Sequence, residues 1–284
     1  MPILKNNHYM PRMLLKHWVT DDETKTREGV YVLDAEKEKT YFSTSKGKKA
    51  FSFAIKKDLY VPRIADKRIL DLEKWFGSLE NSLSKTITKI IADSHKPLFS
   101  NNIDLSKFVL AIFSIKHRSR FQIEKNRELL TNNPDILELV KCRPDNNLEL
   151  ILLENLMNSI EQDSRSLPNF EMVVMESIDT DLIFGDLPFL DNIADGFSFV
   201  PITCKHFIAI RNTTKESFYT KETCSRELTE SINRSIASKS RYWIISNNRD
   251  QLLQYTKEFK QNQDVTARFK PAKFNMRGLI FKNS

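Results

Sequence analysis

ILDLEKWFGSLENSLSKTITKII, residues 69–91, is the stretch of sequence that decides the fold class. Apolar side chains recur in it every three or four residues, which is the spacing of one face of an α-helix. The repeat predicts one helix of about six turns. Its apolar face comprises Ile69, Phe76, Leu79, Leu83, Ile87, Ile90 and Ile91.

Other helices are expected on both sides of this stretch. A short one begins near Pro11, because proline suits the first turn of a helix. Asp104 can cap a longer helix that continues toward Leu130. A further helical region covers residues 148–160, and a last helix covers residues 221–239. The central part of the chain is therefore predicted to be helical.

Strands are predicted before and after these helices. Residues 29–33 and 40–43 are rich in β-forming residues and flank a polar stretch, as in a hairpin. Short β-prone runs also occur at residues 172–175, 182–184, 197–200, 207–210 and 242–246. The prediction is an α+β fold, helix-rich in its N-terminal and central part, with a mainly antiparallel sheet in the C-terminal half.

The domain organisation has two readings. Residues 1–284 fit a single globular unit, because 284 residues exceed one typical domain but fall short of two. Alternatively, residues 66–165 form a helical part, and residues 1–65 with 170–284 form a sheet-containing part.

Composition favours some classes of partner. The chain has a net charge of +7 and a pI near 9.1, which favours a nucleic acid or nucleotide partner, although a lysine-rich solvated surface explains the charge equally well. No apolar run approaches the roughly 20 residues that cross a bilayer. We therefore expect a cytoplasmic protein with no membrane contact, and the oligomeric state stays open.

Two glutamates lie on or beside the apolar face of the helix predicted over residues 69–91. Glu73 and Glu80 continue its three-and-four spacing. Burying an unpaired carboxylate costs several kcal/mol, so a buried glutamate needs a partner. Either side chain can also reach solvent at the edge of the face. Of the two, Glu80 is the better candidate for a functional role.

Arg120 is the expected partner of Glu80. Steps of about 100° along a continuous helix place Lys116 and Arg120 on its inner side and Arg118 nearly opposite. An inward arginine requires carboxylate, phosphate or carbonyl acceptors. Arg120 is therefore a candidate for binding phosphate, or for a structural ion pair with Glu80.

Asp186 is the second acidic candidate. The segment Gly185-Asp186-Leu187-Pro188 directly follows a β-prone run, so the carboxylate is expected at a strand end. Such a position suits a general base or a metal ligand. Ordinary turn chemistry before a proline is the alternative. Asp186 and Glu80 are the candidate ligands if a divalent metal binds.

Three further residues complete the candidate set. His8 can carry a proton if the fold brings it beside the carboxylates, and Arg12 in the same segment is a candidate binding residue. Asn233 can bind a ligand, although a buried structural amide is the commoner arrangement.

The order of several motifs resembles one bacterial protein family. They are His8-Tyr9-x-Pro11-Arg12, the helix carrying Glu73 and Glu80, His117-x-x-Arg120, Phe184-Gly185-Asp186-Leu187-Pro188, Pro201-Ile202-Thr203, and Ile232-Asn233 with Ala237. This order is similar to domain of unknown function 4238, which typically opens with His-Tyr-Val-Pro and later has Thr-Ser-Asp-x-Pro. Here Phe184-Gly185 replaces Thr-Ser. The resemblance implies a bacterial or phage-associated intracellular protein, and no substrate.

Two functions fit these residues. The first is a hydrolase, of a phosphodiesterase or nuclease-like kind, acting on nucleic acid or nucleotides through Asp186, Glu80, His8 and Arg120. The second is a non-catalytic module that binds a polyanion or a protein, in which the polar residues form a structural network. Convergence of the four residues in an open cleft favours the enzyme, and separate burial favours the binding module.

Overall fold

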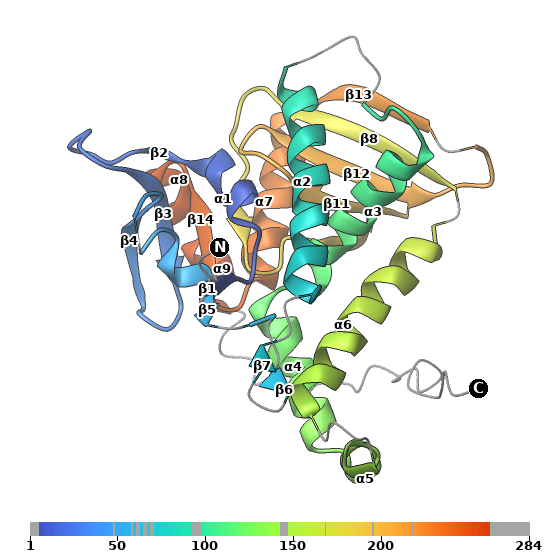
Figure 1. Ribbon diagram of the computed structural model, residues 1–284. Coiled ribbons are helices and arrows are strands. Elements are labelled where there is room, and N and C mark those ends of the chain that lie inside the picture. Colours follow the sequence, from blue (N-terminus) through green and yellow to red (C-terminus); the bar gives the residue numbers. More distant parts are fainter. Residues whose placement is uncertain are drawn as a thin grey trace.

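A computed structural model describes residues 6–47, 49–57, 59–60, 63–64, 67–68, 71–92, 98–142, 147–167, 169–194, 196–216 and 218–261 (Figure 1). The fold is α+β, as predicted, with sheets at both ends of the sequence and helices between them. Ile69 of the predicted helical face lies outside the described residues.

The N-terminal part is built from strands. A short helix α1 (Arg12–Leu15) follows Pro11 as expected and is continued by a 3-10 turn, η1 (Lys16–Trp18). The helix-rich N-terminal part predicted from the sequence is therefore wrong, because α1 and η1 end at Trp18 and residues 28–34 and 39–44 pair as a hairpin. The strands here are β1 (Asn6–His8), β2 (Thr20–Asp21), β3 (Glu28–Asp34), β4 (Lys39–Thr44) and β5 (Ile55–Lys57).

One sheet joins this part to the C-terminal region. The predicted hairpin of β3 and β4 is confirmed, with Val32 opposite Tyr41. On its other side β3 pairs with β14 (Trp243–Ser246), which in turn pairs with β9 (Phe184–Gly185). Three segments far apart in the sequence thus share one sheet. Two small pairings lie outside it, β1 with β5 and β6 (Arg63–Ile64) with β7 (Lys67–Arg68).

Among the described residues, five helices occupy the middle of the chain. The long helix predicted from the apolar repeat is α2 (Asp71–Ile91), with Phe76, Leu79, Leu83 and Ile87 buried. The helix predicted from Asp104 begins earlier, because the Asn101 side chain accepts from the Asp104 N–H and caps it. It also ends earlier. The helices after α2 are α3 (Asn102–His117), α4 (Arg120–Thr131), α5 (Pro134–Cys142) and α6 (Leu148–Arg165).

The second sheet has the order β10-β11-β12-β8-β13 and is mixed. Its first three pairings are antiparallel, whereas β13 runs parallel to β8. The start of the helix predicted over residues 221–239 is wrong, because residues up to Cys224 form β13 and Ser225 caps helix α7. The strands are β8 (Phe170–Ser177), β10 (Leu190–Ala194), β11 (Phe197–Pro201), β12 (His206–Asn212) and β13 (Phe218–Cys224).

Helices cover both faces of this second sheet. Met172, Val174 and Ile208 pack in one cluster with residues of α2 and α3, which lie across the sheet in Figure 1. Residues of the other face, such as Val173 and Phe207, pack with α7 (Arg226–Lys239). Helices α8 (Arg249–Gln254) and α9 (Thr256–Gln261) close the described chain.

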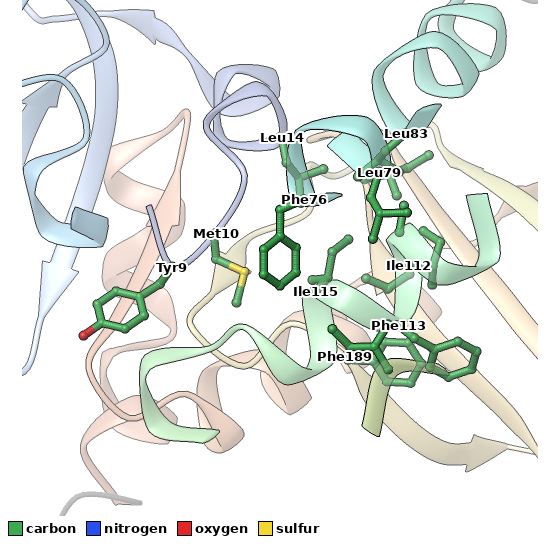
Figure 2. Packing of buried hydrophobic residues seen from close by; sticks show 14 of the residues in the cluster. Tyr9, Met10, Leu14, Phe76, Leu79, Leu83, Ile112, Phe113, Ile115 and Phe189 are labelled. Carbon is green, nitrogen blue, oxygen red and sulfur yellow. The ribbon is translucent and has the colours of Figure 1, made fainter. Parts of the chain in front are cut away.

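The larger cluster also contains N-terminal residues. Figure 2 shows Met10, Leu14 and Phe76 packed beside Ile115 of α3. Trp18 donates from Nε1 to the Leu182 carbonyl at 2.7 Å, and its ring centroid lies 4.8 Å from that of Phe184. The N-terminal segment, the central helices and the second sheet therefore share one core.

Candidate functional site

Arg118 is the most enclosed basic residue of the candidate region. Its side chain is 3% exposed, and all three of its terminal nitrogens donate hydrogen bonds. Nη1 bonds Glu80 Oε1 at 2.7 Å, Nε bonds the Tyr60 hydroxyl at 3.0 Å, and Nη2 bonds the His8 carbonyl at 3.3 Å. The guanidinium also lies 4.4 Å from the centroid of the Phe76 ring. Arg118 therefore ties β1 to α2 and α3.

This arrangement overturns two expectations. Glu80 pairs with Arg118 and not with Arg120, and Arg118 points inward. The reason is a break in the helix: α3 ends at His117, Arg118 caps its C-terminus, and Ser119 accepts from the Gln122 N–H at the start of α4. Counting angles along one continuous helix fails across such a break.

Arg120 lies at the first turn of α4, in a more open environment. Its Nη2 is 2.7 Å from Glu36 Oε1, and its Nε is 2.9 Å from Glu124 Oε1. The guanidinium stacks 4.0 Å from the centroid of the Tyr242 ring, whose hydroxyl donates to Glu124. Burial and the bond to Glu124 raise the pKa of the Tyr242 hydroxyl. Arg120 thus joins α4, the β3–β4 turn and the segment before β14.

Asp186 lies directly after β9, as the sequence predicts, but it is buried. Only 1% of it is exposed, and its Oδ1 accepts from the backbone N–H groups of Arg241, Tyr242 and Trp243 at 2.9, 3.1 and 3.3 Å. Its Oδ2 accepts no hydrogen bond from a described residue. Burial raises the pKa of the Asp186 carboxyl to about 6, although the three N–H bonds lower it.

Ser240 limits the size of the residue that can precede Asp186. A Cβ added at Gly185 would lie 2.0 Å from the buried Ser240 Oγ and 3.1 Å from Ile236 Cγ2. A residue larger than glycine at position 185 therefore requires Ser240 to move. Gly185 stands where the family pattern typically has the serine of Thr-Ser-Asp-x-Pro, and its lack of a side chain is consistent with this close contact between β9 and the end of α7.

The two N-terminal candidates lie on different surfaces of the same segment. His8 is half-buried in β1 opposite Ile55, and burial lowers the pKa of its imidazole. Its Nε2 is buried and has no hydrogen-bond partner in the described chain. Arg12 is exposed and donates from Nη2 to the Ser45 carbonyl at 3.0 Å.

Asn233 is a buried structural amide, the commoner of the two arrangements expected from the sequence. It is fully buried, its Oδ1 accepts from the Ile183 N–H at 2.9 Å, and its Nδ2 donates to the Asp181 carbonyl at 2.9 Å. Nδ2 also lies 3.3 Å from the Tyr255 hydroxyl. The amide fixes the chain entering β9 against α7, and these bonds occupy the groups that a ligand would need.

The candidate residues therefore meet in two groups. His8 and Glu80 are joined through Arg118, whereas Arg120 and Asp186 both contact the segment that leads into β14. The described residues contain no group of three or more acidic, histidine or cysteine side chains arranged to hold a metal ion. None of the described helices has the length and apolar character that crossing a membrane requires.

Two residues that sequence reasoning missed lie near Arg120. Lys56 on β5 and Tyr9 after β1 both interact electrostatically with Glu124, Arg120 and Arg127 of α4. Arg127 is held by a two-point ion pair with Glu149 of α6, at 3.2 and 2.8 Å. Lys56 belongs to no apolar repeat or known spacing, and Tyr9 occurs only within the His8-Tyr9-x-Pro11-Arg12 motif, which assigns it no role. Only the pairing of β1 with β5 places them together.

Comparison with known proteins agrees with the order of these elements. The sequence pattern of one family, described as protein of unknown function (DUF4238), matches residues 6–250. The chain belongs to the DUF4238 family. The match extends from β1 to the first turn of α8, so the Arg118 cluster, Asp186 and Asn233 all lie within the DUF4238 region. No curated protein and no solved structure matches the chain.

Proposed function

We propose that this DUF4238 protein is a non-catalytic module that binds a polyanion, with nucleic acid as the ligand class. The observation that carries the proposal is the enclosure of Asp186, which is 1% exposed and accepts three backbone N–H groups. A general base must come within hydrogen-bond distance of a substrate proton. Asp186 instead holds the chain entering β14, and Arg118 likewise serves internal contacts.

The distribution of charge supports a polyanion. Residues 262–284 contain Arg268, Lys270, Lys273, Arg277 and Lys282 against one acidic residue, so they contribute +4 of the net charge of +7. Stretches with an excess of basic residues are typical of segments that bind nucleic acid. Neutralising phosphates releases counterions, which gives binding that weakens steeply with salt.

Fluorescence anisotropy with labelled single-stranded RNA, single-stranded DNA and duplex DNA tests this proposal at increasing salt. We expect log K to fall linearly with log salt, and the triple variant K270A/K273A/R277A to reduce the slope by about two to three. The matched control is K85A/K107A/K257A, which removes three exposed lysines from the helices α2, α3 and α9. Absence of binding at low salt would exclude the proposal. An equal loss in both variants would assign the binding to overall charge.

A hydrolase is the second candidate, and one observation favours it. Burial raises the pKa of Asp186 to about 6, and its Oδ2 has no described hydrogen-bond partner. A carboxyl with a strongly raised pKa is a feature of many catalytic sites. On this alternative, Asp186 is the base, His8 the acid, and Glu80 or Asp186 holds a divalent metal. Turnover of RNA, DNA or nucleotides that Asp186→Asn abolishes while the fold is retained would favour it.

A further inference from the structure

Tyr9 carries a hydroxyl for which no partner is described. The residue follows β1 and is 4% exposed, and its backbone carbonyl accepts from the Tyr60 hydroxyl at 3.4 Å. Figure 2 shows its hydroxyl directed away from Met10 and Phe76, toward the outside of the apolar cluster. No described group hydrogen-bonds to this hydroxyl. The hydroxyl oxygen itself reaches the surface of the described chain, so it is free to donate to a ligand.

Lys56 lies on the neighbouring strand and is also without a described partner. It is half-buried on β5, opposite Asn7 of β1. In the described part of the chain, no carboxylate lies within ion-pair distance of its ammonium group. Burial lowers the pKa of this ammonium and the charge of Arg127 lowers it further, whereas the carboxylates of Glu124 and Glu149 raise it without reaching ion-pair distance. An anion in direct contact with Lys56 would compensate for its burial.

The cations around these two groups are held in place. Arg127 is fixed by its two-point ion pair with Glu149, and Arg120 is fixed by Glu36 and Glu124. Lys56 lies opposite Asn7 in the antiparallel β1–β5 pair, and Tyr9, two residues after Asn7, bonds through its N–H to the Ala54 carbonyl, so both side chains lie on one face of the pair. Arg120, Arg127 and Glu124 act electrostatically on both of them. A fixed arrangement of cations recognises an oxyanion without a large cost of ordering side chains.

We infer, on the basis of the proposed polyanion binding, that the Tyr9 hydroxyl and the Lys56 ammonium form a subsite for one phosphate group of the ligand, beside Arg120 and Arg127. Both groups are donors, and phosphate oxygens accept from a hydroxyl and an ammonium at the same time. The pKa of Tyr9 is raised to about 12, so its hydroxyl keeps its proton at neutral pH.

Lysine methyl groups report on this subsite directly. Reductive methylation with ¹³C-formaldehyde gives every lysine an NMR signal, and the Lys56 signal is the one that disappears in Lys56→Gln. The two probes are inorganic phosphate and a short single-stranded oligodeoxynucleotide. We expect both to shift the Lys56 signal. We also expect Lys56→Gln to weaken oligonucleotide binding by about tenfold, and Tyr9→Phe by several-fold. Lys85→Gln, which replaces an exposed lysine of α2, is the matched control and should change the affinity for the oligonucleotide little.

The outcomes separate this subsite from the proposed function. If the oligonucleotide binds while the Lys56 signal and the affinity of Lys56→Gln stay unchanged, the subsite is wrong and polyanion binding stands. If phosphate shifts the Lys56 signal and no polyanion binds, the proposed function is wrong and the site accepts a free phosphate compound. If neither probe binds, both are wrong. Tyr9→Phe changes one atom, so a weaker affinity in that variant supports the donor role without requiring a change of fold.

Discussion

Removal of the Arg118 side chain should destabilise the protein strongly. Arg118→Ala deletes bonds to Glu80, Tyr60 and the His8 carbonyl, and leaves the Glu80 carboxylate without its partner. Breaking a fully buried ion pair from one side costs about 3–5 kcal/mol. Arg118 is 3% exposed but the Glu80 side chain left behind is 29% exposed, so we expect a loss near the lower end of this range in the free energy of unfolding.

The assay is urea denaturation followed by tryptophan fluorescence, with Arg127→Ala as the matched control. Arg127 also pairs with a glutamate, but its side chain is 29% exposed, so its removal should cost about 1 kcal/mol or less. Arg118→Lys should recover only part of the loss, because one ammonium cannot reproduce a planar group with three partners. A loss below about 1 kcal/mol in Arg118→Ala would show that this cluster does not hold the helices to β1.

Three other substitutions test the fold around the candidate residues. Asp186→Asn should remove a pH dependence of the free energy of unfolding. The pKa of the Asp186 carboxyl is raised from 3.8 to about 6 in the folded state, so the carboxyl stabilises the fold most below pH 4 and loses that contribution as the pH rises to 6. In paired urea titrations the wild type should lose roughly 3 kcal/mol relative to the variant over this range. A difference between the two proteins that is constant from pH 4 to 7 would contradict this. Asn233→Ala should lower the free energy of unfolding by about 1–3 kcal/mol, because it leaves the Ile183 N–H without its acceptor, whereas the Asp181 carbonyl keeps its bond from Gln251. A thermal-unfolding midpoint equal to that of the wild type would refute it. Gly29→Ala should lower the free energy of unfolding by about 3 kcal/mol or more, because the added Cβ would lie 2.1 Å from the Ser43 carbonyl oxygen across the β3–β4 pair. Normal expression and an unchanged melting temperature would argue against this strand register.

Local patterns predicted much of the fold. The apolar repeat gave the buried face of α2 from Phe76 to Ile87, because one helix needs only its own periodicity. The β3–β4 hairpin was equally local. The last residues of β13, 221–224, form a strand although a helix is predicted from residue 221, because Lys221, Glu222 and Thr223 are exposed and show no apolar alternation. Only their pairing with β8 makes them a strand.

The candidate site was predictable only in part. Asp186 at a strand end and Asn233 as a buried amide follow from residues close in sequence. The partner of Glu80 does not, because a break of two residues, Arg118 and Ser119, between α3 and α4 turns Arg118 inward and Arg120 outward. Tyr9 and Lys56 interact electrostatically with Arg127 because β1 pairs with β5 and α4 lies nearby. No spacing in the sequence predicts that these residues are close together.

Binding and chemistry can be followed in one sample. An oligonucleotide with a fluorophore at each end is mixed with the protein in magnesium or manganese, and anisotropy and fragment length are recorded together. The account predicts that anisotropy rises with protein concentration while the oligonucleotide stays intact. Cleavage that disappears in Asp186→Asn would contradict it.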